Sequence, residues 1–208
     1  MTKLLGPDGN PIDFTRLTEE TAAPEMAGIR SAWMDGIAAG MTPRKLAAIL
    51  KAADMGDGHD YLTMAEEMEE LEPQYGTVLG VRKRAIQGLE IQITASSDAA
   101  EDVALADEVR TLFDAPTMAD LVGDLLDALG KGYAICEIMW ETAANRWTPR
   151  EYIWRDPRHF HFDRLTGRHL RLRDGTLDGA DLPAFKFVIQ RFRLKSGMPL
   201  RGGLARFA

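Results

Sequence analysis

Histidine is the first residue type to test for a metal site, because neutral imidazole is the commonest metal ligand. His159-Phe-His161 would place two imidazoles on one face of a strand. A closed zinc site needs four ligands. The chain has a single cysteine, and beyond His159, His161 and the nearby His169 its sole further histidine is His59. Carboxylates such as Asp156 or Asp163 would therefore have to complete the set. We expect instead that the two strand histidines are exposed polar positions opposite the phenylalanines that alternate with them, and we predict no metal and no cofactor.

Glutamates crowd one short segment, which raises the question of paired catalytic carboxylates. They are Glu66, Glu67, Glu69, Glu70 and Glu72. A general acid needs a partly buried carboxyl beside a differently tuned neighbour. Glutamates on adjacent positions of one helix are more typical of a solvated face. Such a face can pair with arginines of a neighbouring subunit.

No other motif predicts catalysis. Cys136 lies in the apolar run Ala-Ile-Cys-Glu-Ile, which indicates a buried packing residue rather than a nucleophile. The glycine-rich segment 197–203 lacks the Gly-Lys-Ser/Thr ending that binds nucleotide phosphates. We therefore predict that the chain is not an enzyme.

Clustered cations form the remaining candidate site. Arg82-Lys83-Arg84 is one cluster, and a series of arginines from residue 164 to residue 173 is another. Strand alternation would place Arg171 and Arg173 on one face. Sequence-independent contact with a nucleic-acid backbone is one reading, and salt bridges between subunits or solvated edges are the favoured one. The candidate subunit-interface or DNA-backbone contacts are Glu66, Glu69, Glu70, Arg82, Lys83, Arg84, Arg171 and Arg173.

Charge is divided unequally along the chain. Residues 1–130 carry ten Lys/Arg against twenty-four Asp/Glu, a balance of −14, whereas residues 131–208 carry fifteen against eight, a balance of +7. Halves of opposite sign can attract each other between copies of one chain. We predict that the acidic helix 60–72 faces basic strands of an adjacent copy.

Composition is that of a globular protein, with 45% hydrophobic and 27% charged residues in a 208-residue chain. No apolar run is long enough for a transmembrane helix, and Pro7 and Asp8 come too early for a secretory segment. The lone cysteine allows no intrachain disulfide, which fits a reducing cytosol.

Helical periodicity precedes strand-like alternation, which predicts an α+β fold with N-terminal amphipathic helices followed by a mainly antiparallel β region. Residues 1–40 are predicted to form a flexible N-terminal arm, and residues 41–208 one domain, helical over 41–130 and strand-rich over 131–208. The predicted helices span 42–55, 60–72, 75–87, 98–113 and a segment from Thr117, which would cap it, to residue 129. The predicted strands span 89–93, 133–140, 151–154, 160–162, 169–173 and 185–193, with a hairpin turn at 165–168.

Five segments stand out in order along the chain. They are Tyr61-Leu-Thr-Met-Ala-Glu-Glu-Met, Tyr75-Gly-Thr-Val-Leu-Gly-Val-Arg-Lys-Arg-Ala-Ile-Gln-Gly-Leu-Glu-Ile-Gln-Ile, Asp127-Ala-Leu-Gly-Lys-Gly-Tyr-Ala-Ile-Cys-Glu-Ile-Met-Trp, Asp156-Pro-Arg-His-Phe-His-Phe-Asp and Ser196-Gly-Met-Pro-Leu-Arg-Gly-Gly-Leu-Ala-Arg. Together they resemble the N-terminal portion of the portal proteins of Mu-like tailed bacteriophages, from about residue 40 onward.

The resemblance implies a structural subunit of a ring, typically of twelve copies, at one vertex of the phage head. Double-stranded DNA passes through such a ring during packaging and ejection, and terminase, capsid, head-completion and tail proteins contact it. The implied location is the virion, with assembly in the host cytoplasm. Portal chains usually continue into further helices, so the matched region would correspond mainly to the outer wing. The alternative is a prophage-derived adaptor that binds protein without conducting DNA.

Overall fold

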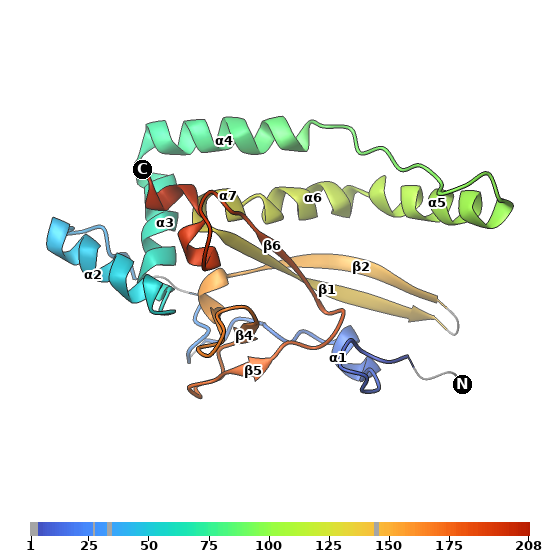
Figure 1. The fold of residues 1–208 in the computed structure, drawn as a ribbon, viewed down its shortest axis with the longest axis horizontal. Coiled ribbons are helices and arrows are strands. Elements are labelled where there is room, and N and C mark those ends of the chain that lie inside the picture. The colour runs from blue at the N-terminus through green and yellow to red at the C-terminus, as the bar shows by residue number, and fades with distance from the viewer. Residues whose placement is uncertain (1–3, 27, 33–34, 144–145) are drawn as a thin grey trace.

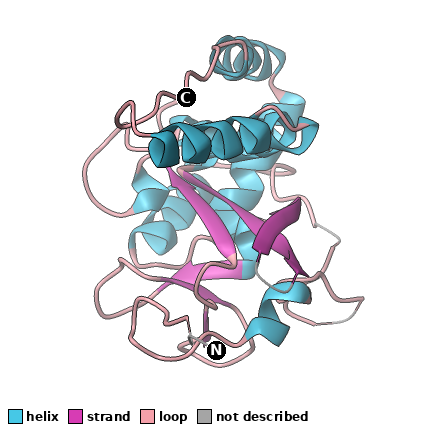
Figure 2. Ribbon diagram, turned by 90° about the vertical axis from the view of Figure 1, so that its right-hand side faces the viewer, coloured by secondary structure: helices cyan, strands magenta, loops and turns pink. Residues whose placement is uncertain are grey.

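The computed structural model describes residues 4–26, 28–32, 35–143 and 146–208. Long helices lie on one side of a small antiparallel sheet, and the N-terminal helix lies on its other side (Figure 1; Figure 2). The helices are α1 (Phe14–Thr18), α2 (Pro43–Asp54), α3 (His59–Leu71), α4 (Pro73–Gln87), α5 (Ala100–Phe113), α6 (Pro116–Leu125) and α7 (Ala128–Lys131). The predicted α+β class is confirmed, with helices before strands.

Helix starts follow the capping signals in the sequence. The Thr42 hydroxyl accepts a hydrogen bond from the Lys45 amide at 3.2 Å, and Pro43 occupies the first turn of α2. Glu72 ends α3 and caps α4, which begins at Pro73. The helices predicted at 42–55, 60–72, 75–87 and 98–113 therefore form within a few residues of the expected bounds. The Thr117 cap is wrong, because Pro116 already begins α6.

The strand predicted at 89–93 does not form. These residues belong to the connection between α4 and α5, which lies along the edge of the helical layer (Figure 1). Leu89 and Ile91 are 68% and 52% exposed, and the Ile93 carbonyl accepts a hydrogen bond from Arg110 Nε at 3.0 Å. Alternation of apolar and polar residues is necessary for a half-buried strand, but a strand also needs a neighbouring strand to pair with.

In the described part of the chain, two three-stranded antiparallel sheets follow the helices. Their strands are β1 (Tyr133–Ala143), β2 (Arg146–Arg155), β3 (Phe160–Phe162), β4 (Leu170–Leu172), β5 (Ala180–Asp181) and β6 (Phe187–Arg191). The first sheet has the order β2-β1-β6 and the second the order β3-β4-β5. Residues 165–168 lie in the turn between the antiparallel strands β3 and β4, as predicted. The predicted antiparallel region is thus confirmed.

The largest core joins both sheets to α2 and α3. Tyr61, Leu62, Tyr133 and Ile135 pack there with the phenylalanines of β3. Gly132 connects α7 to β1 with a φ of 100°, and a Cβ at this position would overlap the Pro199 carbonyl oxygen. The C-terminal turns, η2 (Pro199–Arg201) and η3 (Leu204–Arg206), therefore lie directly against the start of β1.

A buried group of charges, here called the strand cluster, consists of Glu137, Arg155 and Lys186. Glu137 is 0% exposed, and its carboxylate lies 2.8 Å from Arg155 Nε and 3.4 Å from Lys186 Nζ. The same carboxylate accepts hydrogen bonds from the backbone amides of Thr21 and Ala22. The strand cluster therefore attaches the segment after α1 to the sheet. Flexibility of residues 1–40 stays a prediction.

Candidate functional site

The three predicted contact glutamates of α3 differ in their surroundings. Glu66 forms an ion pair with Lys131 of α7, and Glu69 forms one with Lys83 of α4 at 2.6 Å. Glu70 is exposed and has no ion-pair partner among the described residues. Two of the three carboxylates are therefore occupied within the chain, which leaves Glu70 as the one available to a neighbouring molecule.

The expectation of a fully solvated glutamate face is wrong at Glu67. This side chain is 9% exposed, and its carboxylate accepts hydrogen bonds from the backbone amides of Ile37 and Ala38, the second at 2.8 Å. The segment before α2 lies over this part of α3 and covers it. A carboxylate that satisfies buried amides has a structural role.

Lys131 and Asp127 complete a group that we call the helix cluster, together with Glu66, Glu69 and Lys83. The ammonium of Lys131 lies 2.6 Å from Asp127 and 5.6 Å from the centre of the Trp154 ring. Burial works against its charge, but the carboxylates of Asp127 and Glu66 outweigh that effect and raise the pKa of Lys131. Sequence reasoning missed this lysine as a site residue, although its i, i+4 spacing from Asp127 was an available signal.

The basic trio on α4 is likewise divided. Lys83 bridges Glu69 and Asp127, at 2.6 and 3.5 Å. Arg82 and Arg84 are exposed. The two arginines are therefore the members of this trio that remain open to an external anion.

Arg171 lies in β4, and Arg173 directly follows the end of that strand. The guanidinium of Arg171 lies 2.7 Å from Asp181 of β5, and that of Arg173 lies 3.5 Å from Asp57 in the loop between α2 and α3. Among the described residues no ion pair links either arginine to the helix cluster. The eight predicted contact residues therefore do not form one site. Six of them lie on α3 and α4, and the other two lie in β4 or directly after it.

The cysteine and the histidine that were considered as catalytic or metal-binding residues, Cys136 and His159, are both buried. Cys136 is 0% exposed, and burial raises the pKa of its thiol to about 12, so little thiolate exists near neutral pH. His159 is 5% exposed, which corrects the expectation of an exposed strand position, because it lies in the 3-10 turn η1 (Pro157–His159). Over the described ranges, no three His, Cys, Asp or Glu side chains gather as metal ligands would.

None of the helices in the described ranges combines the length and apolarity of a membrane span.

Comparison with known proteins identifies the family that shares this sequence pattern. Residues 62–208 match the family described as the portal protein of Mu bacteriophage. The Mu-like prophage FluMu protein gp29 of Haemophilus influenzae is 32% identical over 99% of this chain, and the portal protein of Escherichia phage Mu is 31% identical over 99%. In both cases the chain spans 40% of the relative's own length.

Proposed function

Because this chain belongs to the portal proteins of Mu bacteriophage, we propose that it serves as a structural subunit of a phage or prophage portal ring. In this proposal the ring forms the head-tail connector vertex, through which double-stranded DNA is packaged and ejected. The single observation that carries the proposal is the family match over residues 62–208. It runs from α3 to the last residue and so contains both sheets and the helix cluster.

The proposed partner of first importance is another copy of the same chain. A ring of twelve subunits for the full-length protein is what the family resemblance implies. The described surface offers unpaired charges of both signs for such contacts, with Glu70 on α3 and Arg82 and Arg84 on α4. The outer helix α5 adds a further exposed carboxylate, Glu101, which has no ion-pair partner among the described residues. We assign the predicted intersubunit contacts to these residues rather than to Glu66, Glu69 and Lys83, which the helix cluster already occupies.

Terminase, capsid and head-completion proteins are the proposed further partners, and DNA is proposed to pass without sequence-specific recognition. The proposed location is the portal vertex of the virion, after assembly in the host cytoplasm. We propose that the described region corresponds mainly to the outer wing of the ring, that residues 1–40 act as an arm, and that the role is architectural rather than catalytic.

Electron microscopy of the full-length protein tests this proposal directly. We expect annular particles with a central opening. The alternative, a prophage-derived adaptor that binds protein without conducting DNA, would give monomers or small assemblies with no channel. Particles of that second kind under every assembly condition would contradict the portal proposal.

Salt dependence tests the proposed charge contacts. If opposite charges hold neighbouring copies together, the mean oligomer size should fall as salt rises from low to about molar concentration, because ionic screening shortens electrostatic reach. Mass photometry measures this distribution. A Glu70→Lys variant should assemble less well at low salt, whereas Glu141→Lys, an exposed position near the end of β1, serves as the matched control. If the oligomer size changes neither with salt nor in the Glu70→Lys variant, the proposed charge contacts are contradicted, but the proposed ring is not.

A further inference from the structure

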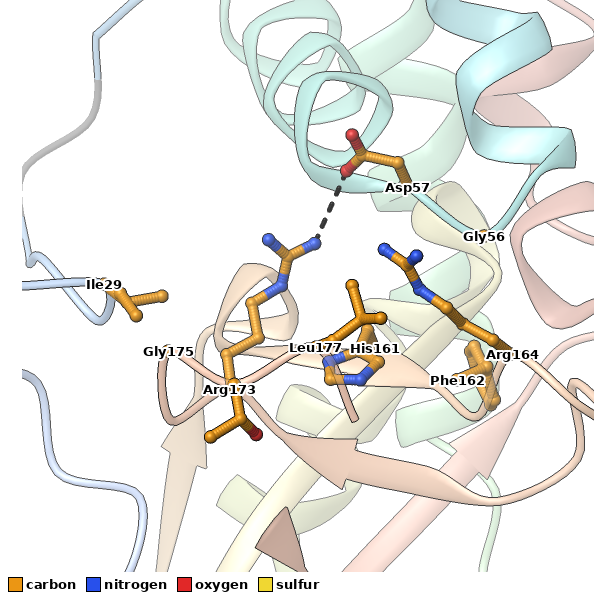
Figure 3. A pocket seen from close by; sticks show the side chains of 10 residues that line it. Ile29, Gly56, Asp57, His161, Phe162, Arg164, Arg173, Gly175 and Leu177 are labelled. Atoms are coloured by element: carbon orange, nitrogen blue, oxygen red, sulfur yellow. Dashed lines mark hydrogen bonds and ion pairs between the residues drawn. The ribbon is translucent and has the colours of Figure 1, made fainter. Parts of the chain in front are cut away.

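A cavity of about 510 Å³ lies between the second sheet and the loop that joins α2 to α3 (Figure 3). Its walls combine apolar and charged side chains. They include Ile29, Asp57, His161, Arg164, Arg173 and Leu177. Leu177 is 66% exposed, so the cavity opens to solvent and a ligand can enter it.

Two guanidinium groups converge on this cavity from different positions. Arg164 belongs to the turn after β3 and Arg173 follows β4, and Figure 3 shows both side chains directed toward the loop that carries Asp57. Arg164 is exposed and has no ion-pair partner among the described residues. Arg173 has one, at 3.5 Å, but that partner, Asp57, is itself 68% exposed. Arg173 therefore has one solvated carboxylate and the Phe160 carbonyl oxygen, 3.4 Å from its Nε, as partners, whereas Arg164 has no ion-pair partner among the described residues.

His161 forms part of the cavity wall between the arginines (Figure 3). Its Nε2 lies 3.2 Å from the Asp178 carbonyl oxygen. Since a carbonyl oxygen can only accept, Nε2 carries the hydrogen, and the neutral ring has no second hydrogen to donate. The ring position is held closely, because a Cβ at Gly179 would come within 2.5 Å of His161 Cε1.

We propose that this cavity binds a phosphoryl group, with the guanidiniums of Arg164 and Arg173 as its principal ligands. A guanidinium presents a planar pair of N–H donors that matches two oxygens of an anion. A carboxylate has only two oxygens, which one such fork satisfies. A phosphoryl group has three charged or partly charged oxygens, so two forks can bind it together.

The competing explanation is that both arginines are ordinary surface cations. Isolated solvated arginines need no cavity, and exposed ion pairs contribute little. Here the two side chains line the same concave site, and the one carboxylate paired with either of them among the described residues, Asp57 beside Arg173, is largely exposed. The underpaired charge and the concave shape together favour a bound anion over a solvated surface.

The phosphoryl group has two sources, a free phosphate or nucleotide and the backbone of a nucleic acid. Isothermal titration of the chain with inorganic phosphate, a nucleoside monophosphate and a short DNA duplex separates them. Binding of phosphate and the monophosphate indicates a small-ligand site. If the duplex binds and added phosphate displaces it, the site contacts a nucleic-acid backbone. Either result supports the proposed class of ligand, and no binding by any of the three would overturn it.

Substitutions locate the binding in this cavity. Arg164→Gln should weaken phosphate binding about tenfold or more, because one of the two forks is lost. Arg164 is exposed, so this variant should fold normally. The matched control is Arg168→Gln, an exposed arginine in the same turn that does not line the cavity. Equal affinity in the Arg164→Gln and Arg168→Gln variants would exclude this site, and competition by acetate as strong as by phosphate would exclude phosphoryl preference.

The Asp57→Asn variant should change the phosphate affinity in the direction opposite to Arg164→Gln. It removes the one carboxylate that competes for Arg173, so phosphate should bind more tightly, by about threefold to tenfold. Weaker phosphate binding in Asp57→Asn would show that the carboxylate positions Arg173 for a structural purpose, and would count against the proposal.

Sulfate titrations at different pH values examine the role of His161. The charged groups that face this ring are Arg164, Arg171, Arg173 and Asp174. Burial and the arginines lower the pKa of His161, and a bound dianion opposes that shift. Sulfate keeps its charge from about pH 8 to about pH 5, the range in which histidine titrates, so its affinity should rise as the pH falls. His161→Gln should remove this rise, and an unchanged pH profile in that variant would exclude His161 as a ligand.

This inference does not depend on the portal proposal. The titrations measure a cavity within one chain, whereas electron microscopy measures assembly of many. Phosphate binding without rings, or rings without phosphate binding, would contradict one proposal and leave the other intact.

Discussion

The strand cluster and the helix cluster each contain a buried lysine, yet the pKa values of the two lysines are shifted in opposite directions. Lys186 is 0% exposed and Lys131 is 2% exposed. Burial lowers the pKa of Lys186, since its carboxylate partner, Glu137, is shared with Arg155. The pKa of Lys131 is raised, despite burial, because the carboxylates of Asp127 and Glu66 both contact its ammonium.

Burial alone does not decide the pKa of a buried lysine in this protein. The number of carboxylates that each cation can contact decides it, because desolvation opposes every buried charge and only close counter-charges offset it. The arginine-lined cavity differs from both clusters in being open to solvent, and its two arginines face one exposed carboxylate, Asp57. Its excess of positive charge is the reason to expect a ligand there.

Removal of the central carboxylate of the strand cluster should have the largest effect. Glu137→Gln leaves Lys186 buried without a counter-charge and leaves Arg155 with the half-exposed Glu20 as its one remaining carboxylate among the described residues, so the free energy of unfolding should fall by about 3–5 kcal/mol. Urea denaturation monitored by circular dichroism measures this. Glu141→Gln, an exposed position on the same strand, is the control and should change little. A loss below about 1 kcal/mol at Glu137 would show that the strand cluster contributes little to stability.

Loss of the lysine from the helix cluster should have the second largest effect. Lys131→Met leaves the carboxylates of Asp127 and Glu66 facing each other, and we expect a loss of about 2 kcal/mol. The exposed Lys195→Met is the matched control. Equal stabilities of these two variants would contradict the structural role of the ion pairs.

The pH dependence of the same variant carries a definite sign. The folded state holds the Lys131 proton more tightly than the unfolded state, whose pKa is near 10.5. The stabilisation that the charged Lys131 gives to the folded state is therefore complete below about pH 10.5, and it is lost as the pH rises through the raised pKa of the folded state. The stability difference between the parent and Lys131→Met should shrink above about pH 10.5.

Lys186→Met should have a smaller effect at neutral pH, within about 1 kcal/mol, because Glu137 keeps Arg155 and two backbone amides as partners. The lowered pKa of Lys186 means that the unfolded state binds its proton more tightly. The parent should consequently gain stability relative to this variant as the pH rises toward about 10.5. The same sign of pH dependence for both lysine variants would refute the comparison between the clusters.

The smallest effect is expected for an exposed ion pair. Arg146 of β2 and Glu108 of α5 are 3.8 Å apart, and their side chains are 60% and 62% exposed. Glu108→Gln should change the free energy of unfolding by less than about 0.5 kcal/mol. Chemical denaturation of the parent and the variant side by side checks this value, and a loss above about 1 kcal/mol would show that exposure is a poor guide to these energies.

Helices with strong end signals were predictable, whereas the strand at residues 89–93 was not. Thr42-Pro43 and Pro73 set helix starts through local backbone geometry and capping. The segment 89–93 has the alternation of a strand, but its outcome depended on whether another strand lay beside it. The candidate site shows the same limit, since nothing in the sequence indicated that Asp57 and Arg173 would meet.

Patterns in the amino-acid sequence were enough to predict the α+β order, most helix bounds, the antiparallel character of the C-terminal region, and the family through its ordered segments. Which charged side chains have partners within the chain depends on the tertiary fold. It placed Glu66 against Lys131, covered Glu67 with the preceding segment, and left Arg164 and Arg173 around an open cavity. The physical reason is that capping and periodicity act between neighbours in the chain, whereas the fate of a charge depends on desolvation and on counter-charges that only folding brings near.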